Sequence, residues 1–114
     1  MNVHLELLRA NTPLIDLRSP IECAKGTFPQ SVNLPILNND ERAKIGKTYK
    51  HQGNAAAVKL GHRLVSGEHK EIRVSGWKKF IDKNPSTWMY CMRGGQRSNI
   101  AQDWLDDIGV KVPI

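Results

Sequence analysis

The chain has 114 residues, which is enough for one domain with a small core and too few for two. Its 39% hydrophobic and 25% charged residues are typical of an ordinary globular protein. No apolar run is long enough to span a membrane, so we expect no membrane partner. The two cysteines, Cys23 and Cys91, have no CxxC spacing, which favours a reducing, cytoplasmic compartment over a disulfide framework.

The net charge of +6 leaves two interpretations open, a merely basic protein or one that binds a polyanion such as RNA. Basic side chains concentrate in the middle third of the sequence, which favours a patch modestly. They are His51, Lys59, His62, Arg63, His69, Lys70, Arg73, Lys78 and Lys79.

In chain order, residues 3–10 could form a short helix, and the apolar run at 13–18 predicts a buried strand. A helical turn is expected over 20–25, ending at Gly26, and alternation at 31–35 predicts a second strand. We therefore expect a strand–helix–strand start to the fold.

The pattern from Asn39 to about Lys83 predicts three helical segments. The first begins at 40–44 with Asn39 or Asp40 as N-cap, and the second covers 55–65. The third covers about 69–82, with an apolar stripe made of Ile72, Trp77, Phe80 and Ile81.

Residues 88–91 predict a strand that leads into Gly94 and Gly95. The spacing of apolar residues from Ile100 to Ile108 then predicts an amphipathic helix ended by Gly109, with a last strand over 110–114. Strands that alternate with helices predict an α/β fold with a mainly parallel sheet. Ligands bind such folds at the carboxyl ends of strands, where Cys91 lies.

The segment Tyr90–Ser98, read YCMRGGQRS, carries the chemistry. Two glycines let its backbone curl into a nest of N–H groups for an anion, and the following helix adds the positive end of its dipole. A thiol there is expected to favour the thiolate, so Cys91 is the candidate nucleophile. The predicted anion-binding loop comprises Met92, Arg93, Gly94, Gly95, Gln96, Arg97 and Ser98.

Other kinds of site are not expected. Cys23, between Glu22 and Ala24, is interpreted as a core residue, because no glycine or cation cluster follows it directly. His51 and His62 have no partner at metal-ligand spacing, and no Walker motif for a nucleotide occurs.

Two motifs resemble the rhodanese family. They are LIDLRSPIE at 14–22, followed by GTFPQSVNLP at 26–35, and Tyr90-Cys91 with its glycine-rich loop. The resemblance implies a rhodanese-like fold over residues 1–114 and sulfur transfer through a cysteine persulfide. The loop departs from common single-domain rhodaneses, because five residues rather than four separate Cys91 from Arg97. Phosphatases share this C-x5-R length.

A narrower resemblance covers nearly the whole chain. Residues 38–42, 46–53, 60–67 and 91–98 are similar, in order, to the rhodanese domain of bacterial tRNA 2-selenouridine synthases. It implies that Cys91 carries selenium, as a perselenide or equivalent adduct, in converting 2-thiouridine to 2-selenouridine at the tRNA wobble position. The implied partners are tRNA and selenophosphate, with geranyl diphosphate as a further co-substrate and no cofactor.

That family's full-length protein continues with a P-loop domain, and its rhodanese fold ends with one more helix. We therefore expect the chain to be a truncated form whose activity depends on the missing half. Two other functions stay open from the residues, namely a C-x5-R phosphatase and a non-catalytic module that binds tRNA or another partner through its basic middle.

Overall fold

The fold is built around a three-stranded parallel sheet in the computed structural model, which describes residues 11–91 and 96–114. The strands are β1 (Leu14–Asp16), β2 (Ser31–Asn33) and β3 (Trp88–Tyr90), in the order β2-β1-β3. In the register of the sheet, Ile15 of β1 lies opposite Val32 on one side and Met89 on the other. The central strand is therefore covered along both edges, and all three of its residues are buried.

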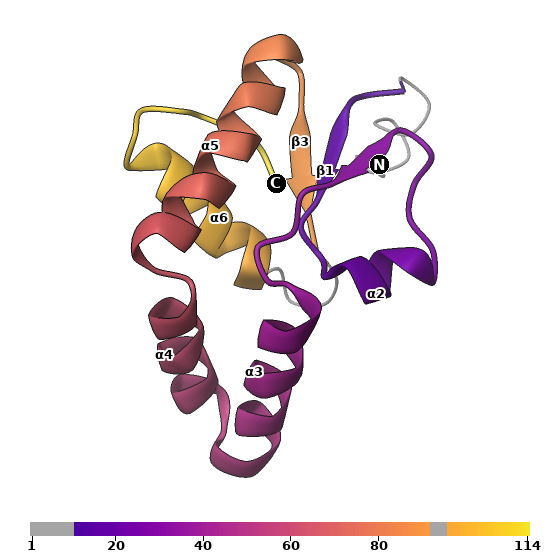
Figure 1. Cartoon of the computed structure of the whole chain (residues 1–114). Coiled ribbons are helices and arrows are strands. Elements are labelled where there is room, and N and C mark those ends of the chain that lie inside the picture. Colours follow the sequence, from indigo (N-terminus) through magenta and orange to yellow (C-terminus); the bar gives the residue numbers. More distant parts are fainter. Residues whose placement is uncertain (1–10, 92–95) are drawn as a thin grey trace, which may run out of the picture.

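Five helices surround the sheet among the described residues: α2 (Pro20–Ala24), α3 (Asn39–Gln52), α4 (Asn54–Leu64), α5 (Gly67–Lys83) and α6 (Gln96–Asp106). Figure 1 shows α5 and α6 together on one side of the sheet and α2 on the other. Helices α3 and α4 form a hairpin that projects from the end toward which the strands' carboxyl ends point (Figure 1). The predicted α/β class with a parallel sheet is confirmed.

The core lies between the sheet and the pair α5–α6. Trp77 of α5 and Trp104 of α6 stack with ring centroids 6.2 Å apart, over the buried strand residues Ile15 and Met89. The Trp77 indole N–H donates to the carbonyl of Leu34 at 2.9 Å, which satisfies its one polar atom inside the core. Helix α6 is thus fixed against the core by packing, and its first turn is held next to the carboxyl end of β3.

Of two helix ends predicted from the sequence, the N-cap of α3 was wrong and the end of α6 is confirmed. Helix α3 is capped by Asn38, not by Asn39 or Asp40: the Asn38 side chain accepts from the Glu41 backbone N–H at 2.8 Å, and the Glu41 carboxylate accepts in return from the Asn38 N–H. Gly109 ends α6 as predicted, with a φ of +78°. The Val110 N–H reaches back to the carbonyl of Leu105 at 2.9 Å, as a Schellman motif requires.

Two expectations from the sequence need correction, and a third concerns residues that the structure does not describe. The strand predicted over residues 110–114 is absent. The Met89 N–H does donate to the carbonyl of Pro113 at 3.0 Å, as in a sheet. The pairing goes no further, because proline has no N–H to donate in return. Ile72 and Ile108, predicted to face the core, are 63% and 51% exposed. The helix expected at 3–10 lies outside the described residues. None of the helices described here is long and apolar enough to cross a membrane.

Candidate active site at Cys91 and the first turn of α6

Cys91 directly follows β3 and faces the beginning of α6. Its side chain is half-buried and packs against the core. The Sγ atom accepts a hydrogen bond from the Ser98 backbone N–H at 3.4 Å and donates to Ser98 Oγ at the same distance. The structure therefore brings together two of the predicted site residues, Cys91 and Ser98, across the loop that joins β3 to α6.

The contact with Ser98 matters because of where that residue lies in α6. It is the third described residue of the helix, and its backbone N–H donates to Cys91 Sγ. The Sγ atom of Cys91 therefore lies against the first described turn of α6, toward the positive end of the helix dipole.

The predicted anion-binding loop lies only partly within the described residues. Met92, Arg93, Gly94 and Gly95 are outside them, so the nest of backbone N–H groups stays a prediction. Gln96, Arg97 and Ser98 are described and form the first turn of α6.

Arg97 was predicted to belong to the anion-binding loop, and in the structure its planar guanidinium group binds a carboxylate. Its Nη1 and Nη2 atoms donate to the two carboxylate oxygens of Glu22 at 2.7 and 3.3 Å. Arg42 of α3 approaches the same carboxylate, with 3.6 Å between its Nε and Glu22 Oε1. Sequence reasoning missed Glu22 as a site residue. Its only signal was a capping box with Ser19, which predicts a helix start and not a contact 75 residues away.

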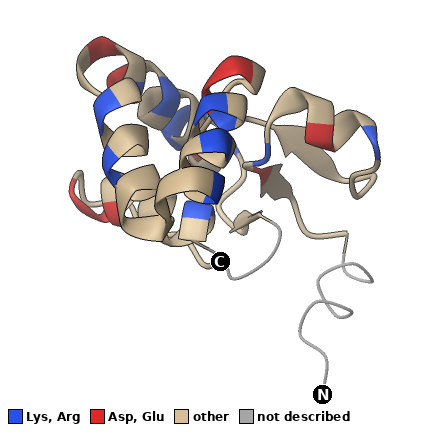
Figure 2. Cartoon of the chain, turned by 90° about the horizontal axis from the view of Figure 1, so that it is seen from below, with Lys and Arg blue, Asp and Glu red and all other residues tan. Residues whose placement is uncertain are grey.

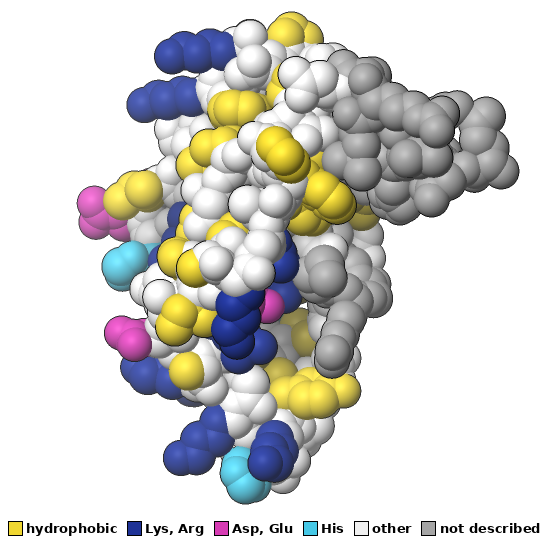
Figure 3. Space-filling view, turned by 90° about the vertical axis from the view of Figure 1, so that its right-hand side faces the viewer, with side chains coloured by type: hydrophobic (Ala, Val, Ile, Leu, Met, Phe, Trp, Pro, Cys, Tyr) yellow, Lys and Arg dark blue, Asp and Glu magenta, His cyan; other side chains and the backbone are white. Residues whose placement is uncertain are grey.

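The cluster of Glu22, Arg42 and Arg97 carries a net positive charge. Burial by itself raises the pKa of Glu22, but the hydrogen bonds from Arg97 and Ser19 outweigh it and hold the pKa at about 2. Glu22 is therefore ionised at neutral pH, and one negative charge against two positive ones leaves the cluster at +1. Figure 3 shows Lys and Arg side chains next to an acidic side chain near the middle of this face of the molecule.

A second polar cluster lies behind the site, at the end of β1. The buried Asp16 carboxylate accepts from Arg18 Nη2 at 2.7 Å, from Thr27 Oγ1 at 2.8 Å and from the Tyr90 hydroxyl at 2.8 Å. Burial opposes ionisation of Asp16, yet its hydrogen bonds, above all those from Arg18, keep its pKa well below the ordinary range. Because Tyr90 precedes Cys91 in the chain, this cluster fixes the backbone from which the thiol projects.

Cys23 is a different kind of thiol from Cys91. It lies on α2, half-buried and outside the hydrophobic core, so its assignment as a core residue was wrong. Burial and the neighbouring Asp16 carboxylate together raise the pKa of Cys23 to about 11. The thiolate form is therefore rare near neutral pH, which is the reason to set Cys23 aside as a nucleophile.

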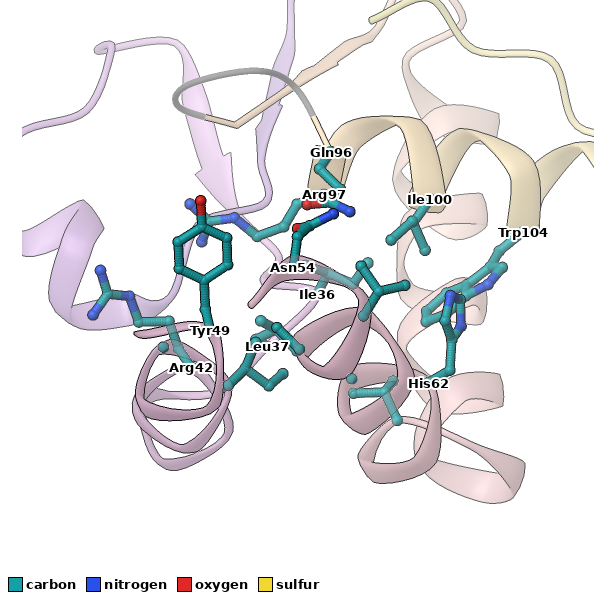
Figure 4. A pocket seen from close by; sticks show the side chains of 16 residues that line it. Ile36, Leu37, Arg42, Tyr49, Asn54, His62, Gln96, Arg97, Ile100 and Trp104 are labelled. Carbon is teal, nitrogen blue, oxygen red and sulfur yellow. The ribbon is translucent and has the colours of Figure 1, made fainter. Parts of the chain in front are cut away.

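A pocket of about 320 Å³ opens on the other side of the first turn of α6, between that turn and the hairpin α3–α4. Figure 4 shows Arg97, Gln96 and Asn54 at its upper rim, Tyr49 and Arg42 at one side, and Trp104 and His62 at the other. Apolar side chains, including Ile36 and Ile100, cover its inner wall. Arg97 borders the pocket and Ser98 contacts Cys91, so consecutive residues of α6 connect the two.

The described residues contain no group of three His, Cys, Asp or Glu side chains arranged as metal ligands would be.

Comparison with known proteins gives consistent names. The chain is 55% identical over 108 residues to a tRNA 2-selenouridine synthase of Bdellovibrio bacteriovorus, covering 95% of this chain and 28% of that protein. It is 57% identical over 102 residues to the tRNA 2-selenouridine synthase of a Sulfurovum species, covering 90% of this chain and 28% of that protein. The chain is also 56% identical over 108 residues to the Nitrosomonas eutropha protein of the same name, covering 95% of this chain and 28% of that protein. The chain thus spans little more than a quarter of the length of these curated relatives.

Among solved structures, the fold is similar to the N-terminal domain of a putative ATP/GTP-binding protein from Clostridium difficile 630. The TM-score is 0.78 at 28% identity, over 90% of this chain and 79% of that one. No protein-family model matches the chain. The relatives' names agree with the resemblance found in the four sequence motifs. The chain therefore corresponds, over nearly all of its length, to one domain-sized part of tRNA 2-selenouridine synthases, which confirms the family that those motifs indicated.

Proposed function

We propose that Cys91 is the nucleophile of a chalcogen transfer that converts 2-thiouridine to 2-selenouridine at the wobble position of tRNA, with selenophosphate as donor. The observation that carries this proposal is the contact of Cys91 Sγ with the Ser98 N–H at the start of α6. The names of the relatives support tRNA modification, but the chain spans only 28% of their length. The proposed activity therefore belongs to the longer protein, in which this chain would supply the reactive thiol.

The charge around the thiol suits a phosphate-bearing donor. Arg97 has five N–H donors, of which Glu22 takes two, so three remain for an incoming anion. Together with Arg42 the cluster has a charge of +1 before a ligand binds. Oxygen atoms of selenophosphate would hydrogen-bond to the planar fork of Arg97, leaving the selenium toward Cys91.

The overall exchange balances without any oxidant. Attack of water on phosphorus breaks the Se–P bond, so that phosphate leaves and selenium keeps the electron pair of that bond as selenide. At the nucleoside, a C2–selenium bond forms as the C2–sulfur bond breaks, and sulfur departs with the electron pair of the bond it loses. Between the two events Cys91 holds selenium covalently, which needs a disulfide as co-reactant: selenide attacks Sγ of a mixed disulfide between Cys91 and a small thiol, and the S–Se bond forms as the S–S bond breaks and the small thiolate leaves. After the C2–selenium bond has formed, a small thiolate attacks Sγ, selenium keeps the electron pair of the broken S–Se bond, and the mixed disulfide is restored, so there is no net oxidation. Arg97 with Arg42 stabilises the departing phosphate.

The test is intact-mass spectrometry of the chain, first converted to its mixed disulfide with a small thiol, after exposure to selenophosphate under anaerobic conditions. We expect an adduct of one selenium atom on the native chain and on Cys23→Ser, and none on Cys91→Ser. In a synthase of full length, Cys91→Ser is expected to abolish formation of 2-selenouridine, measured by mass spectrometry of digested tRNA. Selenation that persists in that variant would disprove the role of Cys91.

A phosphatase remains the second candidate, because Cys91 and Arg97 have the C-x5-R spacing. Such an enzyme needs a protonated carboxyl group as general acid. Asp16 and Glu22 are both ion-paired and have lowered pKa values, so neither meets that need. Hydrolysis of an aryl phosphate by the chain, lost in Cys91→Ser, would favour the phosphatase over the transferase.

A further inference from the structure

The hairpin α3–α4 has a one-sided charge. From residue 42 to residue 67 the sequence contains six Lys and Arg and no Asp or Glu. Five of these cations, those other than Arg42, form no ion pair with any described residue, and all of them are exposed. They are Lys44, Lys47, Lys50, Lys59 and Arg63. Figure 2, which looks at the molecule from below, shows blue Lys and Arg positions on the helices that face the viewer.

This arrangement refines the basic patch predicted from the sequence. Three of the cations expected to form it are engaged elsewhere: Arg73 pairs with Glu41, Lys78 pairs with Asp82, and Lys70 lies over the Trp104 ring. Lys79 of the predicted set stays exposed on α5, but the densest group of exposed, unpaired cations is that of α3 and α4. The lower end of the molecule in Figure 3, where this hairpin lies, displays Lys, Arg and His side chains.

The pocket at the base of the hairpin combines apolar walls with planar and amide side chains at its rim. Tyr49 is 58% exposed and stands with its hydroxyl toward Arg97, and Asn54 and Gln96 face each other across the opening (Figure 4). Its volume of about 320 Å³ falls at the lower end of ordinary ligand pockets. A nucleobase has the matching chemistry: a flat apolar face for Tyr49 and polar edges for the two amides.

We infer that the hairpin α3–α4 binds the backbone of a single-stranded stretch of RNA, and that the pocket between the hairpin and α6 receives one unstacked nucleotide of it. The inference rests on the proposed function for the identity of the RNA as tRNA. Phosphates lie along the exposed lysines of the hairpin, and the base is held against Tyr49. Two consecutive residues then connect that nucleotide to the thiol, because Arg97 borders the pocket and Ser98 contacts Cys91.

The first experiment measures binding of a fluorescent RNA stem–loop with a seven-nucleotide unpaired loop to the chain, by anisotropy over a series of salt concentrations. The double variant Lys47→Ala/Lys50→Ala removes two hairpin cations. We expect a shallower salt dependence, with the slope of log affinity against log salt reduced by between about one and two. The matched control, Lys79→Ala/Lys83→Ala, removes two exposed cations of α5 and is expected to leave the slope unchanged.

The second experiment tests the pocket. Tyr49→Ala removes an exposed ring, so the fold is expected to tolerate it, and the affinity for the stem–loop should fall by roughly five-fold or more. Ile72→Ala, which removes an exposed apolar side chain of α5, is the control and should bind as the native chain does. Equal affinity of Tyr49→Ala and the native chain would overturn the assignment, and would leave the pocket to an apolar peptide segment.

The outcome can be separated from that of the proposed chemistry. Cys91→Ser keeps the hairpin and the pocket, so it should bind the stem–loop as the native chain does. A chain that takes up selenium at Cys91 but binds RNA no better than its hairpin variant would refute the RNA site alone. Selective RNA binding without a selenium adduct would support the RNA site and refute the role of Cys91.

Discussion

The ion pair between Glu22 and Arg97 predicts a specific dependence of stability on acid. Because the pKa of Glu22 is lowered from its ordinary value of 4.5 to about 2, its charged form stabilises the folded state. This stabilisation is fully present above pH 4.5 and is lost as the pH falls through the folded-state pKa near 2. At about 1.4 kcal/mol for each pKa unit, the shift corresponds to roughly 3 kcal/mol, of which about 2 kcal/mol disappears between pH 6 and pH 3.

Glu22→Gln removes this titration while it keeps the size of the side chain. Urea unfolding, followed by tryptophan fluorescence at pH 6 and pH 3, would give the free energy of unfolding of both proteins. We expect the native chain to lose about 2 kcal/mol more than the variant over that interval. Asp16 also has a lowered pKa, but it contributes equally to both proteins and cancels in the difference. An identical loss in the two proteins would refute the assignment of the ion pair.

Three further predictions concern single positions. Asn38→Ala removes the cap of α3 and should cost about 1 kcal/mol of unfolding free energy in urea denaturation. Gly109→Ala places a side chain on a residue with a φ of +78° and should lower the free energy of unfolding by about 1 kcal/mol. Gly76→Ala, inside α5 with open space around it, should raise that free energy by about 0.5–1 kcal/mol. A change of the same sign in both variants would contradict this reasoning. With limiting iodoacetamide at pH 8, peptide mapping should find Cys91 alkylated well before Cys23, whose pKa is about 11. Faster labelling of Cys23 would reverse the assignment of roles.

Local patterns gave most of the fold. The apolar runs at β1 and β3 and the final glycine at 109 were read correctly, because each depends on neighbours within a few residues. The N-cap of α3 was predicted one or two residues too late, at Asn39 or Asp40 instead of Asn38. The strand expected at 110–114 failed because the hydrogen-bonding partner, Met89, lies far away in sequence and Pro113 cannot continue a ladder. Likewise, the predicted stripe of α5 was correct for Trp77 and Ile81, which are buried, but it included the exposed Ile72 and missed the buried Val74.

The candidate site was likewise predictable where it depends on neighbouring residues and not where it depends on distant ones. The prediction that Cys91 sits between a strand end and a helix start is confirmed, since strand, loop and helix are consecutive in the chain. The partner of Arg97 could not be predicted, because Glu22 is 75 residues away and reaches it only through the packing of α2 beside α6. The pocket was missed for a related reason: it is formed by three helices whose apolar positions each looked like ordinary core.

Helix α2 shows what the Glu22–Arg97 contact does beyond charge. It has only five residues and buries none of them, so its contacts with α3 and α6 are polar: the Ile21 N–H to Asn39, and Glu22 to Arg42 and Arg97. An anion that draws Arg97 away from Glu22 would loosen the attachment of α2 and expose its amides to hydrogen exchange. Deuterium uptake in residues 20–24 would therefore rise as the anion site fills, so that a short helix without a core of its own reports occupancy of the neighbouring site.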